Sequence, residues 1–244
     1  MDLRQLVAQK SELIAQKKQV PRWGAVDHTP ALKTGAKSFE QIQDGVARVR
    51  FVGNTYNWLD SDMDILVPGA AAKSIMERGP KARNLIAHLR DHKYDVTARV
   101  GSLVDVKEEQ YEGDRFGLVF ESDIRRSYNE KVYEQYERGD INQHSIGFRY
   151  TKLDLAVNDP SQEEYKAWEQ YRPDIINPER ADELGYFWVV KEIMLLEVSS
   201  VLWGANSETG MLSSEPTVSL AAEPSDDTLR LLQSISETLQ KTKQ

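Results

Sequence analysis

The sequence predicts an α+β fold, a mixed and largely antiparallel β-barrel or sandwich that carries helices. Three observations lead to this prediction. Short runs of alternating apolar and polar residues begin after Gly45, two or three further stretches have helical composition, and residues 185–206 form the most apolar part of the chain. Many short strands combined with few helices are typical of this fold class. A length of 244 residues suits one domain of ordinary size with appendages.

The N-terminal segment is expected to form an amphipathic helix over residues 1–19. Apolar residues from Leu3 to Ile14 recur at helical spacing, and Pro21 ends the pattern. With the irregular stretch that follows, this helix makes up an N-terminal region over 1–40. Two interpretations fit the pattern: a helix docked on its own domain, or an arm that binds a partner or is removed by processing.

A central domain is expected over residues 41–206. Its expected elements are strands over 46–57, 97–109, 115–124 and 144–157, helices over 70–79 and 128–138, and two central strands within 185–206. Residues 158–186 are acidic and aromatic and contain three prolines, so they are expected to form a loop-like insertion.

The chain after this domain is expected to contain a linker and one more helix. Residues 207–226 are rich in Ser, Pro and Glu, as linkers are. Residues 227–244 place leucine and isoleucine along one stripe of an amphipathic helix. A single amphipathic helix beyond a linker is usually a docking or oligomerisation element.

The composition excludes several classes of protein. The formal net charge of −8 argues against a dedicated nucleic-acid binder, because phosphate binding needs a dense basic face. The chain has no cysteine, which excludes disulfides, thiolate nucleophiles and cysteine-ligated zinc. No apolar run approaches the roughly 20 residues that cross a membrane. We therefore expect a soluble protein used in a cytoplasm, in which covalent acyl chemistry would use Ser, Thr or Lys.

Ser145 is a candidate nucleophile. It stands where a turn leads into a strand, in the sequence DINQHSIGF, and Gly147 is expected to leave room for a substrate backbone. Taken alone, a structural serine in a turn is the simpler interpretation of this position.

Among the four histidines, His88 and His92 lie four residues apart in IAHLRDH. The simplest interpretation is two solvent-facing histidines on one helical turn. Histidines at this spacing can share a zinc ion. However, Leu-Arg-Asp stands between them where a helical zinc protease has a glutamate, and no third ligand is evident.

Glu197 is a charged residue inside the apolar run LLEVSSV. A buried carboxylate costs several kcal/mol or so unless it is paired, so a buried Glu197 would need a partner such as an imidazole. The alternative is that Glu197 points to solvent from an edge strand, and the alternation of the run does not decide between the two.

Six blocks in this order resemble the prohead protease family of tailed bacteriophages. They are DSDMDILVPGAAAKSIMERGPK, LIAHLRDH, VGSLVDVKE, RFGLVFESDI, ERGDINQHSIGF and LLEVSSVLWGAN, and the resemblance covers about residues 45–206. The family pattern includes D-x-D-x-[IV]-x-P-G-A, a histidine after a short apolar stretch, S-[IV]-G-F and L-x-E-[IV]-S-x-V. The resemblance implies a serine peptidase related in fold to the herpesvirus assembly proteases, a mostly antiparallel β-barrel surrounded by helices, with terminal helical extensions.

The resemblance also implies a Ser-His-Glu triad. Ser145 in HSIGF matches the nucleophile, and Glu197 in LLEVSSV takes the third position. The histidine matches His92 or His88, and His92 is preferred because LRDH aligns with the family's apolar-x-x-His. In such a triad the histidine acts as general base and the acid orients it. This chemistry requires no metal or organic cofactor.

The family's substrates are scaffold segments and the N-terminal extension of the major capsid protein, which are cut inside an unexpanded shell. By this resemblance the expected location is the host cytoplasm, within the immature capsid. The expected partners are the major capsid protein, scaffold segments and further copies of the chain, without direct contact to nucleic acid or membrane. The terminal helices also fit a protein that cuts itself.

Two other functions fit parts of the sequence. A non-catalytic scaffold or assembly protein on the same fold would bind capsid protein without cleaving it, and the two terminal helices support this alternative. A hydrolase with paired carboxylates, such as a glycosidase, would use the many acidic residues and the five tryptophans. The tryptophans are scattered, however, and nothing singles out a carboxylate pair.

Overall fold

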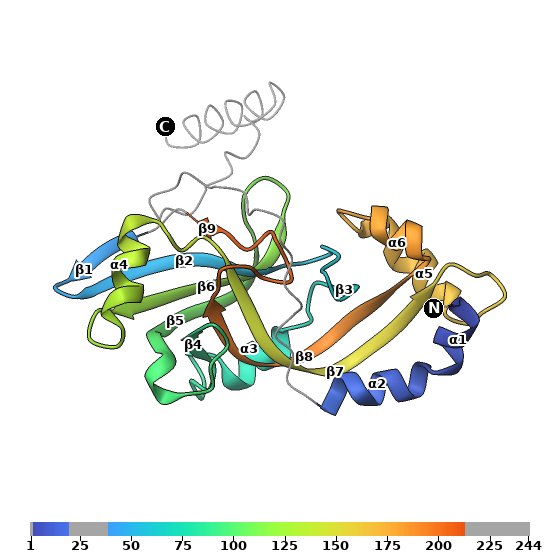
Figure 1. The fold of residues 1–244 in the computed structure, drawn as a ribbon, viewed down its shortest axis with the longest axis horizontal. Coiled ribbons are helices and arrows are strands. Elements are labelled where there is room, and N and C mark those ends of the chain that lie inside the picture. Colours follow the sequence, from blue (N-terminus) through green and yellow to red (C-terminus); the bar gives the residue numbers. More distant parts are fainter. Residues whose placement is uncertain (1, 20–38, 213–244) are drawn as a thin grey trace, which may run out of the picture. The chain divides into compact units, whose positions relative to one another are not determined.

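The computed structural model describes residues 2–19 and 39–212 (Figure 1). The irregular arm that follows the first helix, most of the expected linker and the expected helix over 227–244 lie outside the described residues. Among the described residues, no helix has the length and apolar character needed to cross a membrane.

The expected N-terminal helix is present as two helices, α1 (Leu3–Ala8) and α2 (Lys10–Gln19). Helix α2 packs against strand β7. Lys17 Nζ lies 2.6 Å from Asp64 Oδ1, and the Asp64 carboxylate, which is almost completely buried, also accepts a hydrogen bond from the Tyr150 hydroxyl. A buried carboxylate needs such partners, so α2 is docked on its own domain.

In the part of the chain that the structure describes, nine strands form one mixed sheet. They are β1 (Phe39–Gln43), β2 (Val46–Thr55), β3 (Asp64–Leu66), β4 (Ala87–Arg90), β5 (Arg99–Gln110), β6 (Phe116–Arg125), β7 (His144–Val157), β8 (Tyr186–Ser200) and β9 (Met211–Leu212). The strand order is β1-β2-β6-β5-β4-β8-β3, with β7 paired to β8 and β9 paired to β2. Strands β3 and β4 run parallel to β8, and the other pairs are antiparallel.

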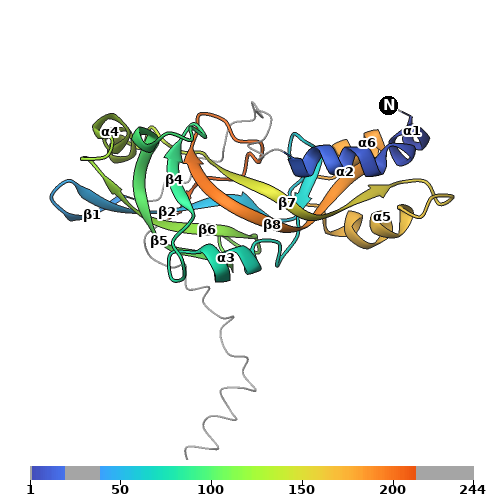
Figure 2. The ribbon, with the colours of Figure 1, turned by 90° about the horizontal axis from the view of Figure 1, so that it is seen from below.

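The mixed α+β class is confirmed, but the prediction of a barrel is wrong. A barrel requires the two end strands of the sheet to pair with each other. In residues 39–212, β1 pairs only with β2, and both β7 and β3 pair only with β8, so the sheet stays open. The long strand β8 pairs with β7 along one edge and with β3 and β4 in succession along the other. Figure 2 shows β7 and β8 running together across the sheet.

Helices lie at several places along the sheet. They are α3 (Ala72–Arg78), α4 (Glu130–Arg138), α5 (Tyr165–Tyr171) and α6 (Glu179–Leu184), with short 3₁₀ helices η1 (Val96–Ala98) and η2 (Arg172–Asp174). The expected helices over 70–79 and 128–138 correspond to α3 and α4. The structure therefore confirms both helices to within two residues at each end.

Two expectations for the last third of the domain are wrong. Residues 158–186 are not loop-like, because they contain α5, η2 and α6. Trp168 of α5 is buried, and its ring centroid lies 5.3 Å from that of Phe187 in β8. Residues 185–206 were expected to hold two strands, yet Tyr186–Ser200 forms a single strand of 15 residues. No glycine or proline interrupts the apolar run before Gly204, so nothing in it ends the strand early.

Candidate active site

The three predicted site residues come from three neighbouring elements. Ser145 is the second residue of β7, Glu197 lies near the end of β8, and His92 is the second residue after β4. In the β7–β8 pair, Ser145 is opposite Ser199 and Gly147 is opposite Glu197. Opposite residues in an antiparallel pair, and residues two apart in one strand, point to the same face of a sheet. Ser145 and Glu197 therefore share one face.

His92 and Glu197 are in direct contact. His92 Nδ1 lies 2.7 Å from Glu197 Oε1, and the Glu197 side chain is fully buried. Asp91 and His92 have φ angles of 51° and 52°, and the Asp91 N–H donates to the Ser200 carbonyl. Two consecutive left-handed residues make a tight turn that brings the imidazole back onto β8. The idea that Glu197 points to solvent is therefore wrong.

Ser199 holds the same carboxylate from its other side. The Ser199 hydroxyl donates to Glu197 Oε2 at 2.6 Å and accepts from the His92 backbone N–H at 3.1 Å. Both Glu197 oxygens are thus bonded, one to the imidazole and one to Ser199. Ser199 was not predicted as a site residue, although the E-x-S spacing on a strand places the Glu197 and Ser199 side chains on one face.

Gly147 provides the space that the Glu197 carboxylate occupies. A Cβ atom at Gly147 would lie 2.0 Å from Glu197 Oε1 and 3.0 Å from the Tyr94 hydroxyl oxygen. The glycine was expected to make room for a substrate backbone, and in the structure a side chain of the protein itself occupies the space beside its Cα atom. The glycine of the SIGF block is therefore needed to seat the acid of the site.

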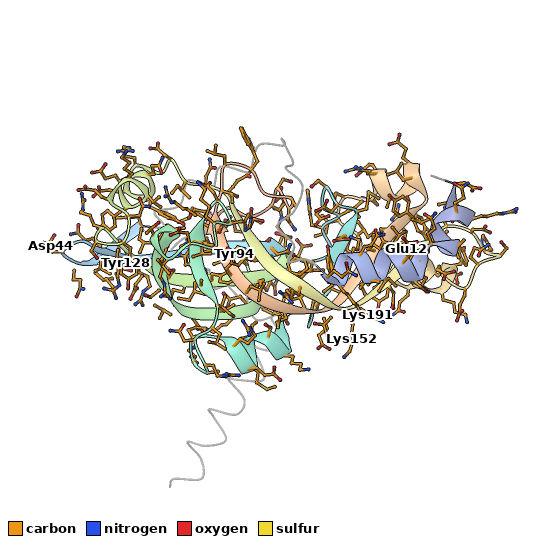
Figure 3. All side chains as sticks on the ribbon, turned by 60° about the horizontal axis from the view of Figure 1, so that its bottom comes forward. Glu12, Asp44, Tyr94, Tyr128, Lys152 and Lys191 are labelled. Atoms are coloured by element: carbon orange, nitrogen blue, oxygen red, sulfur yellow. The ribbon has the colours of Figure 1, made fainter. Side chains whose placement is uncertain are left out.

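Tyr94 lies over the same part of the sheet, as the label in Figure 3 shows. Its side chain is about half exposed, at 54%. Burial of the phenol and then the charge of Glu197 raise the pKa of Tyr94 to about 12, against an opposing effect of Arg149. The phenol therefore stays neutral at physiological pH, and its hydroxyl lies beside Gly147.

His88 lies on the opposite face of the sheet from His92. It stands in β4 beside Val198, is fully buried, and its Nδ1 is 2.8 Å from the Ser122 hydroxyl. Its Nε2 is 3.3 Å from the Tyr136 hydroxyl. The expectation of two histidines on one helical turn is wrong, since a strand and a turn carry them. Within the described residues, no three His, Asp or Glu side chains gather as a metal site.

His144 completes this buried polar cluster beneath the sheet. Its Nε2 is 2.8 Å from the Tyr136 hydroxyl, and its ring stacks on Phe51 with centroids 3.8 Å apart. Burial lowers the pKa of His144 to about 3, and burial together with the neighbouring His144 and Arg99 lowers the pKa of His88 well below its usual value. Both rings are therefore neutral at physiological pH, and they support the start of β7, the strand that carries Ser145.

Ser145 is largely buried, with 8% of its surface exposed. The structure brings His92 and Glu197 into contact and places Ser145 on the adjacent strand of the same face. No hydrogen bond joins Ser145 to either of them among the described residues. Catalytic hydrogen bonds are often long in enzymes without substrate and shorten when substrate binds.

A serine nucleophile candidate beside a histidine–carboxylate pair is the constellation of a serine hydrolase. A family model described as Caudovirus prohead serine protease matches residues 44–222, which is most of the chain. The chain belongs to this family, and it is therefore a serine protease of the prohead type. This match confirms the resemblance that the six sequence blocks indicated.

The solved structure of the bacteriophage T4 capsid assembly protease, gp21, is also similar. The comparison covers 76% of this chain and 94% of that chain, with 13% sequence identity and a TM-score of 0.40. No curated protein sequence gives a significant match.

Proposed function

We propose that this protease cleaves scaffold segments and the N-terminal extension of the major capsid protein inside the immature capsid, with Ser145 as nucleophile, His92 as general base and Glu197 as the orienting acid. The observation that carries the assignment is the 2.7 Å contact between His92 Nδ1 and a fully buried Glu197, one strand away from Ser145. Self-association and self-cleavage belong to the same proposal.

The proposed reaction has two steps. In the first, Ser145 Oγ forms a bond to the peptide carbonyl carbon while His92 Nε2 takes the hydroxyl proton. His92 then gives that proton to the leaving amine as the C–N bond breaks. In the second, water attacks the acyl-enzyme with His92 again as base, and the serine is released. Glu197 keeps the second imidazole proton on Nδ1, which makes Nε2 the basic nitrogen.

The test is to co-express the chain with its capsid protein and weigh every product by intact-mass spectrometry. Wild-type enzyme is expected to produce new termini, and Ser145→Ala and His92→Ala are expected to lower turnover by about 10⁴–10⁶-fold. Ser161→Ala, a serine beyond the far end of β7, is the matched control and should cleave normally. Glu197→Gln should lose about 10⁴-fold, since it removes only the orienting charge.

The same experiment separates the two histidines and the competing function. His88→Ala should lower stability but leave the folded fraction active, because His88 faces the buried cluster and not Glu197. Full activity of a folded His92→Ala variant would refute the choice of base. Capsid protein that stays uncut with wild-type enzyme, in shells that do form, would instead indicate a non-catalytic assembly protein.

A further inference from the structure

A cavity of about 380 Å³ opens beside the proposed site, between strand β4 and the turn that follows it. It is lined by Asn84, Leu85, Ile86, Ala87, Leu89, Tyr94, Asp95, Val96 and Arg99. We call it the Tyr94 pocket. This volume lies within the range of pockets that enclose small ligands or side chains of a bound chain.

The Tyr94 pocket is mainly apolar. Ile86 and Leu89, only 2% and 6% exposed, are its most buried apolar members, whereas Leu85, Tyr94 and Val96 are exposed. Val96 is 94% exposed, which is unusual for a side chain placed beside two other exposed apolar groups. Exposed apolar side chains that gather around one hollow indicate a binding site more strongly than scattered ones do.

The charged residues at the pocket leave its apolar character intact. The Asp95 carboxylate accepts hydrogen bonds from the Thr97 N–H and hydroxyl, at 2.7 and 2.6 Å. Arg99 Nε donates to the Gly101 carbonyl at 3.3 Å. The two side chains have opposite charges, so the pocket does not select for one sign of charge.

The position of the pocket relative to Ser145 follows from the sheet register. Leu89 pairs with Ser199, and Ser199 pairs with Ser145, so the three residues stand side by side on β4, β8 and β7. Neighbouring strands are about 4.8 Å apart, so Leu89 is about 10 Å from Ser145, or about three residues of an extended peptide. Tyr94 lines the pocket and also lies over Gly147, so its side chain borders both the pocket and the proposed site.

We propose that the Tyr94 pocket receives an apolar side chain of the protein substrate, about three residues from the bond that Ser145 attacks. The occupant is a segment of the substrate because Tyr94 borders both the pocket and the proposed site, so a peptide bound at Ser145 can extend to the pocket. This inference rests on the proposed function, and it adds to it a preference for an apolar residue at one fixed distance from the cut.

The test uses Val96→Asp, which places a charge at the rim without disturbing the core, and Met76→Asp as the matched control. Met76 is also an exposed apolar residue, at 71%, but it does not line the pocket. Each enzyme digests a mixed peptide library, and mass spectrometry identifies the cut sites. Wild type and Met76→Asp are expected to prefer a large apolar residue over lysine by about tenfold or more at one position near the third from the cut. Val96→Asp is expected to reduce this preference at least fivefold or so while still cleaving peptides.

Three results would overturn the inference. Cleavage that depends on Ser145 but shows the same preference in Val96→Asp and wild type would exclude the pocket while leaving the proposed function intact. Normal cleavage by Val96→Asp together with loss of self-association in native mass spectrometry would make the pocket an interface between copies. Absence of any cleavage that depends on Ser145 would refute the proposed function, and the substrate pocket with it.

Discussion

Replacement of Gly147 by alanine is expected to inactivate the enzyme by moving Glu197. The new Cβ would lie 2.0 Å from Glu197 Oε1 and 2.8 Å from Cδ. Ordinary contact begins near 3.4–3.5 Å, so the carboxylate must move by about 1.4 Å or more. The backbone itself is not the obstacle, because Gly147 does not have a left-handed φ angle.

A movement of this size separates the acid from its partners. The carboxylate is held at 2.7 Å from His92 and at 2.6 Å from Ser199, and an added 1 Å or so would exceed hydrogen-bond distance for both. We expect kcat/KM to fall by about 10³–10⁴-fold, which is close to the fall in activity expected when an orienting acid is removed from a triad. Overpacking at a well-filled position should lower the free energy of unfolding by about 1–3 kcal/mol.

The assay is a double-mutant cycle with Glu197→Ala, read out by urea unfolding and by peptide cleavage. Once the carboxylate is gone, the alanine methyl meets mainly the half-exposed Tyr94 side chain, which can move. Gly147→Ala should then be neutral or slightly stabilising, since alanine is better than glycine in a strand by about 0.5–1 kcal/mol. Gly53→Ala, whose Cβ would lie 2.3 Å from Phe120, is the control, and its cost should not depend on Glu197.

Equal costs of Gly147→Ala in the two backgrounds would refute this reasoning. Such additivity would mean that Gly147 is required for something other than seating the carboxylate, for example the approach of a substrate backbone.

Three further predictions concern the groups around the site. Ser199→Ala should lower kcat by about 10–100-fold with little change in KM, because it removes one charge-assisted hydrogen bond of about 1.5–3 kcal/mol from Glu197. An equal change in KM would instead mean that Ser199 has a role in substrate binding. Acid should destabilise the fold, because burial depresses the pKa of His144 and His88 in the folded chain. The unfolded chain therefore binds protons that the folded chain does not bind. The free energy of unfolding should be constant above about pH 7 and should fall below about pH 6.5 by up to ~1.4 kcal/mol per pH unit for each histidine. Unfolding in urea from pH 7.5 to 5 checks this, and His144→Phe should show a shallower decline. Lys17→Met should cost about 2–3 kcal/mol, because Asp64 would keep its buried charge without a cation, and an unchanged unfolding midpoint would contradict the docking of α2.

Much of the sheet could be predicted from the sequence. The expected strands over 46–57, 97–109 and 115–124 match β2, β5 and β6 to within two residues, and the strand over 144–157 matches β7 at both ends. Each combines alternating apolar residues with a turn signal at its ends, which is local information. Strand β4 has only four residues, too few for a periodic signal.

The wrong predictions about the fold concern the pairing of distant strands and helices that lack a local start signal. Closure of the sheet depends on which distant strands meet, and the parallel pairs of β3 and β4 with β8 have no sequence signature. Helices α5 and α6 have no side-chain hydrogen bond at their N-caps, so the usual start signal was absent.

For the candidate site, the sequence blocks indicated the three residues but not their surroundings. The choice between His88 and His92 depends on which face each occupies, and this follows only once β4 is known to be a strand. The role of Gly147 could not be predicted either, because it depends on its being opposite Glu197 in the β7–β8 register. The identities of the candidate site residues could thus be predicted from the sequence, whereas their partners on neighbouring strands could not.

The register of β7 against β8 also decides whether a folded chain has any active site. A slip by one residue would turn every side chain of β7 to the other face. Ile146 would then face the Glu197 carboxylate in place of Gly147, and His144 would replace Ser145 beside Ser199. If Ser145 is the nucleophile as proposed, a chain that mispairs these two strands would have no serine in place, so proteolytic activity would report correct strand pairing.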